Sequence, residues 1–221
     1  MMIRVQVAVL LLVGLGTLCE AQKLRESPAT NDNVSRFVPP NAILVMQLAV
    51  HFGDSTPSEM VLAYAAESTP TISTGVRVIK NGSIIFEDSG GVVNGAGASD
   101  AIRIEKVKAG NGSEGVLVAL KNSGAGTATD WHVLAMVSGK ISRLNPGRTR
   151  TKILEQRGYQ DWGYNGVTAN GEYIIETQPG YSRETARCCP DRPTIKMIFE
   201  FNGTSMRLDR VAELPFTRTY P

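Results

Sequence analysis

Residues 195–210 read IKMIFEFNGTSMRLDR, and this stretch decides the fold class. Every second residue from Ile195 to Phe201 is apolar, which is typical of a strand with one buried face. Asn202 and Gly203 follow, and this dipeptide tolerates the positive φ angles of a tight hairpin turn. A second strand-like run comes after the turn. The stretch therefore predicts a β-hairpin.

The same hairpin pattern occurs twice earlier in the chain, in residues 75–88 and 131–145. The first reads GVRVIKNGSIIFED and turns at Asn81-Gly82, and the second reads WHVLAMVSGKISRLN and turns at Ser138-Gly139. The second run is apolar on both faces around Trp131, which suits a central strand covered on both sides. Three spaced hairpins indicate a repeated β-meander, and repeats of this period weigh heavily in assigning a fold.

A glutamate precedes the first apolar run of each unit. The glutamates are Glu59, Glu114 and Glu172, and each follows a glycine-rich turn. Equivalent positions in three repeats suggest a shared structural role, such as accepting hydrogen bonds from backbone N–H groups at the turn. The alternative is that they are solvated residues at the start of a strand.

These patterns predict an all-β protein of repeated antiparallel meander units, arranged as a partial propeller or as a sandwich of stacked sheets. We expect a signal peptide at 1–21, a flexible linker at 22–38 and one all-β domain at 39–221. The three units of this domain cover about 39–100, 101–150 and 151–221. One short helix is expected at 151–157, ended by Gly158.

The N-terminus reads MMIRVQVAVLLLVGLGTLCEAQ, and its pattern is typical of a secretory signal helix. Arg4 supplies the positive start, and the apolar run that follows is shorter than the about 20 residues of a membrane span. We expect cleavage before Gln22, which predicts a secreted or periplasmic protein with no stable membrane span. A lipid anchor on Cys19 and a retained N-terminal anchor are the alternatives.

The charge balance argues against nucleic-acid partners. The chain holds 23 Lys and Arg against 21 Asp and Glu, a formal net charge of +2. Nucleic-acid binding proteins usually carry a basic stripe or patch, and the basic residues here are interleaved with acidic ones. The remaining partner class is an extracellular or cell-envelope ligand of unknown chemistry.

The Gly-Asp turn at residues 53–54, followed by EMVLAYA from Glu59, resembles an FG-GAP or VCBS-type repeat, the unit of some extracellular β-propellers. The chain as a whole also resembles secreted bacterial proteins of unknown function that carry a late RCCPDRP segment. The FG-GAP resemblance implies blade-like units. That family binds calcium in a loop of alternating aspartates, but residues 54–59 offer only two carboxylates. We therefore predict no metal and no cofactor.

The best catalytic pair in the sequence is Asp130 and His132. They share one strand face across Trp131, and the chain has only 2 histidines. A hydrolase would need a third polar group from elsewhere in the fold. The alternative is a structural imidazole that is hydrogen-bonded inside an apolar strand.

Cys188 and Cys189 are adjacent and are followed by Pro190. Export places them in an oxidising compartment, where they can form a vicinal disulfide. Adjacent Cα atoms lie closer than the usual disulfide range, so this ring requires a distorted or cis peptide. Bridging between molecules and a free thiol pair are the alternatives, and a thiol-based redox or metal role remains a second function hypothesis.

The segment 178–193 predicts a long loop within the third unit, and binding residues concentrate on such loops. Its arginines could clamp an anionic group, or they could pair with the acidic residues of the same loop. A second aromatic cluster lies at 158–164 and could form a ligand platform or pack beneath the sheet. We expect a non-enzymatic binding or scaffolding module whose candidate residues are Tyr181, Arg183, Arg187, Arg192, Trp162 and Tyr164.

Overall fold

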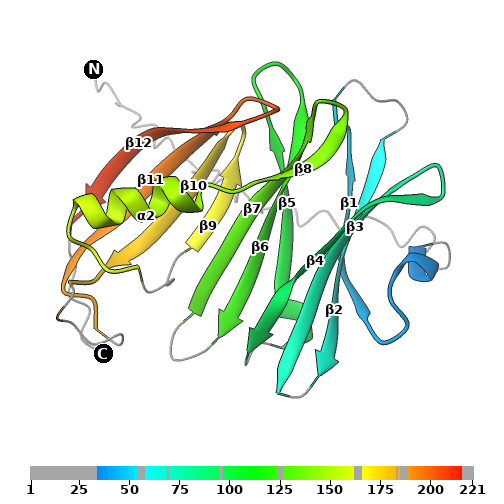
Figure 1. Cartoon of the computed structure of the whole chain (residues 1–221), viewed down its shortest axis with the longest axis horizontal. Coiled ribbons are helices and arrows are strands. Elements are labelled where there is room, and N and C mark those ends of the chain that lie inside the picture. The colour runs from blue at the N-terminus through cyan, green and yellow to red at the C-terminus, as the bar shows by residue number, and fades with distance from the viewer. Residues whose placement is uncertain are drawn as a thin grey trace, which may run out of the picture. The chain divides into compact units, whose positions relative to one another are not determined.

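Figure 1 shows the computed structural model of the chain. The chain divides into residues 1–31 and residues 32–221. The structure describes residues 34–53, 58–68, 70–94, 97–123, 127–161, 166–182, 184 and 189–215, all of which belong to the second unit. The predicted signal peptide and most of the predicted linker lie outside these residues.

The described residues form three four-stranded antiparallel sheets, each a meander of strands consecutive in sequence. This confirms the predicted all-β class of repeated meander units. The first sheet contains β1 (Ile43–Val50), β2 (Glu59–Ser68), β3 (Thr71–Lys80) and β4 (Ser83–Asn94). The second contains β5 (Ile102–Lys108), β6 (Glu114–Ser123), β7 (Thr127–Val137) and β8 (Lys140–Leu144). The third contains β9 (Gly166–Asn170), β10 (Tyr173–Gly180), β11 (Arg192–Phe201) and β12 (Met206–Leu214).

The three predicted hairpins join the third and fourth strands of their sheets. The first two have two-residue turns in which both residues have positive φ, for example 52° at Asn81 and 73° at Gly82, as a type I′ turn requires. The third turn is longer. Gly203 has a φ of 99°, while Asn202 Oδ1 accepts hydrogen bonds from the N–H groups of Thr204 and Ser205 at 3.0 and 2.8 Å.

The hydrophobic core consists of two clusters, one on each face of the second sheet. One cluster joins the first and second sheets and includes Val76, Val78 and Leu134. The other joins the second and third sheets and includes Trp131 and, from β11, residues 195, 197, 199 and 201. The second sheet is therefore the middle layer, as the apolar residues on both faces of β7 predict. In addition, β1 lies against β5, and β5 lies against β9.

The short helix α2 (Gly147–Gln156) starts earlier than the sequence predicts. The sequence predicts its start at residue 151. Asn145 Oδ1 accepts a hydrogen bond from the Gly147 N–H at 2.7 Å, which is an Asx-type contact at the helix start. The helix ends near Gly158, whose φ of 69° agrees with the predicted stop. Ile153 and Leu154 pack into the second cluster.

Two single-turn 3₁₀ helices complete the described elements: η1 (Ser35–Phe37) and η2 (Ala98–Asp100). The first lies at the end of the predicted linker, where the carbonyl of Phe37 accepts a hydrogen bond from Arg77. Arg77 also forms an ion pair with Glu87 at 2.8 Å. Among the described residues, no helix has the length and apolar character needed to cross a bilayer.

Candidate functional site

Two chain segments emerge together at one end of the third sheet. One segment follows α2, and the other connects β10 to β11. The N–H of Gln160 donates to the carbonyl of Tyr181 at 2.8 Å, which joins the two segments directly. The second segment is closed at its base, because the Asp191 N–H donates to Gly180 O at 3.1 Å and Asp191 Oδ1 accepts from the Ser182 N–H at 2.8 Å.

Tyr181 and Arg192, two of the predicted binding residues, help to build this base. Tyr181 is 5% exposed, and Arg192 is the first residue of β11. The Arg192 guanidinium lies over the ring of Tyr159, 5.6 Å from its centroid, within the range of a cation–π contact. At Gly180, a Cβ would lie only 2.5 Å from the Tyr159 ring. Tyr181 is thus buried within the base rather than displayed on its surface.

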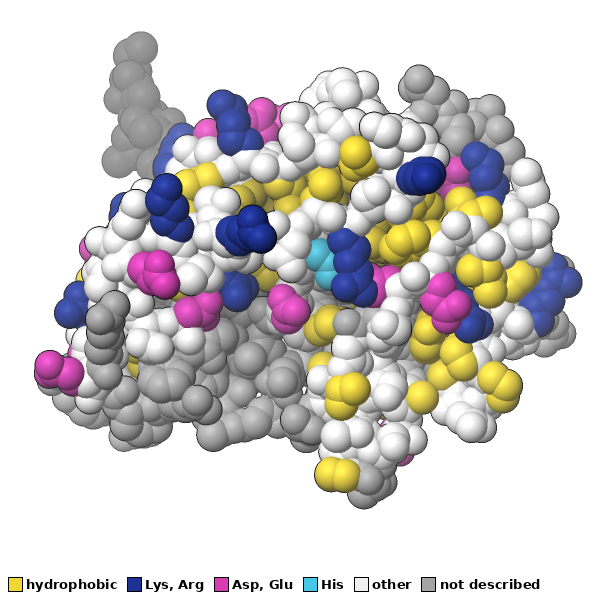
Figure 2. Space-filling model, viewed as in Figure 1, with side chains coloured by type: hydrophobic (Ala, Val, Ile, Leu, Met, Phe, Trp, Pro, Cys, Tyr) yellow, Lys and Arg dark blue, Asp and Glu magenta, His cyan; other side chains and the backbone are white. Residues whose placement is uncertain are grey.

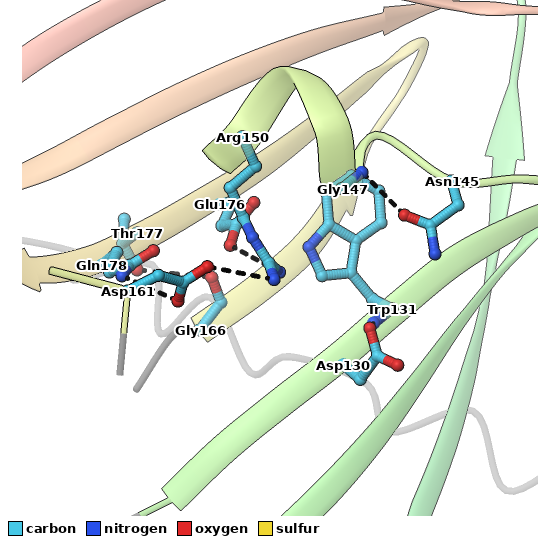
Figure 3. A network of polar contacts seen from close by, with 10 residues as sticks. All are labelled: Asp130, Trp131, Asn145, Gly147, Arg150, Asp161, Gly166, Glu176, Thr177 and Gln178. Carbon is cyan, nitrogen blue, oxygen red and sulfur yellow. Dashed lines mark hydrogen bonds and ion pairs between the residues drawn. The ribbon is translucent and has the colours of Figure 1, made fainter. Parts of the chain in front are cut away.

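A buried polar network lies between α2 and β10, next to this base (Figure 3). Arg150 from α2 lies between two carboxylates, with nitrogen–oxygen distances of 3.3 Å to Asp161 and 3.6 Å to Glu176. Gln178 Nε2 donates to Asp161 Oδ1 at 3.3 Å. Glu176 and Gln178 are completely buried or nearly so, at 0% and 1% exposure. The strand, the helix and the segment after the helix are thus held in one arrangement.

The network retains hydrogen-bonding capacity that the protein itself does not use. Within the described part of the chain, Trp131 Nε1, Gln178 Oε1 and Arg150 Nε are buried without a hydrogen-bond partner. Buried groups of this kind usually bind ordered water or a ligand. Trp131 also packs edge-on against Phe199, with ring centroids 5.5 Å apart. The indole is therefore fixed in place with its N–H available.

The predicted pair of Asp130 and His132 is not brought together as a catalytic dyad. Asp130 is exposed, and its Oδ1 accepts a hydrogen bond from the Trp131 N–H at 2.9 Å. His132 is 5% exposed, and its Nε2 lies 3.0 Å from Oδ2 of Asp88, in the first sheet. Arg143 from β8 contacts the other oxygen of Asp88. This cluster connects the first and second sheets.

Burial lowers the pKa of His132, although the charge of Asp130 acts in the opposite direction. The carboxylate of Asp88 would also favour the protonated imidazole, but Arg143 already neutralises that carboxylate. A neutral imidazole is therefore the resting form near neutral pH, and it serves a structural role between the sheets.

The glutamates at equivalent positions in the first two sheets accept hydrogen bonds from backbone N–H groups, as the sequence predicts. Glu59 Oε2 accepts from the Phe52 N–H at 3.2 Å, and Glu114 Oε2 accepts from the His51 N–H at 2.9 Å. Both donors follow β1. The third glutamate, Glu172, instead occupies the turn one residue before β10.

The pKa of Glu114 reflects opposing influences. Burial alone would raise this pKa, but the hydrogen bond from His51 and the ammonium of Lys106 outweigh the effect of burial and leave it lowered. The Lys106 nitrogen lies 3.0 Å from the carboxylate. Glu114 is therefore ionised at neutral pH and secures the connection after β1.

The other predicted site residues lie outside the described residues: Trp162, Tyr164, Arg183, Arg187 and Cys188. Cys189 is described and is exposed. No group of three or more histidine, cysteine or acidic side chains in the described ranges could hold a metal ion. Sequence reasoning missed Asp88, Glu176 and Gln178, because an acidic or amide residue on a strand has no local signal that reveals its burial. It also missed Arg150, whose ion pairs depend on the position of α2 beside β10.

The chain matches none of the protein-family models, curated proteins and solved structures with which it was compared.

Proposed function

We propose that this protein is a secreted or periplasmic, non-enzymatic binding or scaffolding module. Its ligand contacts would lie at the end of the third sheet, where the segments after α2 and after β10 emerge together. The observation that carries the proposal is the hydrogen bond from the Gln160 N–H to the Tyr181 carbonyl at 2.8 Å. This bond joins the aromatic-rich segment 158–164 to the arginine-rich segment 178–193.

The buried network supports this proposal energetically. Arg150, Asp161, Glu176 and Gln178 fix the ends of both segments. A preorganised base lowers the conformational entropy that binding must overcome. Trp162 and Tyr164 would supply flat apolar contacts, while Arg183 and Arg187 would bind anionic groups bidentately. The expected ligand is an extracellular or cell-envelope molecule that combines anionic groups with flat, apolar surfaces.

The arrangement of the sheets supports the prediction that the meander units form a partial propeller. The first strands of successive sheets are neighbours, since β1 contacts β5 and β5 contacts β9. Blades of a β-propeller also place equivalent strands next to one another around a central axis. We propose that the three meanders are blade-like units of a partial propeller that carries its binding loops at one end of the last blade.

The proposal is tested with the complete mature chain and a triple variant in which Arg183, Arg187 and Arg192 are changed to alanine. The labelled protein is incubated with intact cells and with isolated cell-envelope fractions of its host, and retention is measured. The triple variant should lose most of the retention of the wild type. The control changes three exposed arginines elsewhere, Arg148, Arg207 and Arg210, and should bind normally.

Equal retention of the arginine variant and the wild type would remove the loop assignment. Loss of retention in the control variant as well would indicate nonspecific charge attraction and would contradict the proposal equally. Circular dichroism of each variant establishes that it is folded. Mass spectrometry of the exported protein, with and without reductant, separately tests the predicted disulfide of Cys188 and Cys189, which would make the non-reduced chain lighter by two hydrogens.

A further inference from the structure

A surface groove lies at the opposite end of β11 from the loop base. It is formed between the β8–α2 connection and the β11–β12 hairpin and has a volume of about 300 Å³. This is the lower end of the range for small-molecule pockets. Figure 2 shows hydrophobic side chains gathered on this face between β12 and β8. Its apolar floor includes Leu144, Phe199, Met206 and Leu208.

One wall of the groove carries a cationic group whose position is fixed. Arg143 lines the groove, and 46% of its side chain is exposed. Its guanidinium contacts Asp88, whose side chain is completely buried. Because a guanidinium has five N–H donors, contact with one carboxylate oxygen leaves donors for a ligand. The carboxylate of Asp88 lies beneath the surface, so the guanidinium of Arg143 is the exposed end of the ion pair.

The remaining polar groups on the rim are uncharged. Asn145, Thr149 and Ser205 are the other polar residues of the lining. Among the described residues, no acidic side chain takes part in the lining of this groove. A ligand therefore meets one guanidinium, three uncharged polar residues and an apolar floor.

We propose that this groove binds a small organic carboxylate with a short apolar body. The carboxylate contacts Arg143, since the planar fork of a guanidinium matches the two oxygens of a carboxylate. The apolar body lies on Leu144, Met206 and Leu208, which are partly exposed, and is there removed from water. This site is separate from the loops at the other end of the sheet, so each can be tested without the other.

The test titrates the full mature chain with hexanoate by isothermal titration calorimetry. Hexan-1-ol, which lacks the charge, and acetate, which lacks the apolar body, are the two comparison probes. We expect saturable binding of hexanoate that is on the order of tenfold or more tighter than that of either comparison probe. Absence of saturable hexanoate binding, or equally tight binding of hexan-1-ol, overturns the proposal.

A matched pair of variants locates the binding. Ser205→Glu places a negative charge in the lining of the groove, whereas Thr204→Glu places the same charge on the adjacent exposed residue outside it. Hexanoate binding should be lost in the first variant and retained in the second. Equal binding by both variants overturns the assignment. Arg143→Lys keeps a cation beside Asp88. It should weaken the binding of hexanoate without altering the binding of hexan-1-ol.

Discussion

Replacement of Phe199 by alanine tests whether the third sheet packs on the second sheet. Phe199 is 1% exposed and contacts Trp131 edge-on at 5.5 Å. Truncation of a buried phenylalanine costs about 3–5 kcal/mol, which includes the loss of the aromatic pair. Ile198 provides a matched control, because it is the preceding residue of β11 and lies on the opposite, partly exposed face. Ile198→Ala should cost about 1 kcal/mol.

The assay is urea unfolding followed by circular dichroism. With an m-value of about 2 kcal/mol/M, Phe199→Ala should lower the midpoint by about 2 M, and Ile198→Ala by about 0.5 M. A double-mutant cycle with Trp131→Ala should give a coupling of about 1 kcal/mol. Equal midpoint shifts for the two single variants would refute the assignment of these faces, and zero coupling would refute the Trp131 contact.

Three further predictions concern the buried charges. Asp88→Asn should destabilise the fold by about 1–3 kcal/mol in urea unfolding, because the contact with Arg143 loses its charged acceptor, whereas Asp130→Asn should cost about 0.5 kcal/mol or less; similar costs would contradict the cluster. NMR titration should give His132 a pKa below 6.5, so stability falls below that pH as the unfolded chain takes the proton first; a higher pKa would contradict a neutral resting imidazole. Because the pKa of Glu114 is lowered, its ionised form stabilises the fold above the unfolded carboxyl pKa of about 4.3, and this stabilisation is lost as the pH falls. Glu114→Gln should therefore flatten the acid side of the curve of stability against pH. An unchanged curve would contradict the ion pair of Glu114 with Lys106.

Local patterns predicted the strands and hairpins well, because each depends on neighbouring residues. The turns at Asn81 and Ser138 need positive φ angles, and the dipeptides there reveal this requirement without a structure. Alternation along β11 likewise identified its buried face. The apolar residues on both faces around Trp131 placed β7 in a doubly covered sheet, which is where the structure has it.

The polar clusters could not be predicted, because they depend on how the sheets stack. Asp88 reaches His132 only because β4 and β7 belong to sheets that share a core. In β10 the polar residues Glu176, Thr177 and Gln178 follow one another, so the sequence does not reveal which of them face the core. Its burial beside Arg150 follows from the position of α2 over the sheet. The helix begins at Gly147, before the predicted start at residue 151, and the Gly147 N–H donates to the side chain of Asn145 there.

Amide hydrogen–deuterium exchange across the mature chain tests most directly the claim that the second sheet is the middle layer of three stacked meanders. The central strands β6 and β7 are hydrogen-bonded on both edges and lie in a sheet that is covered on both faces. Their amides should therefore be the slowest in the protein, with those of β1 and β12 exchanging much faster. If β6 and β7 exchanged no more slowly than β3 and β11, central strands of the two outer sheets, the stacked arrangement would be wrong.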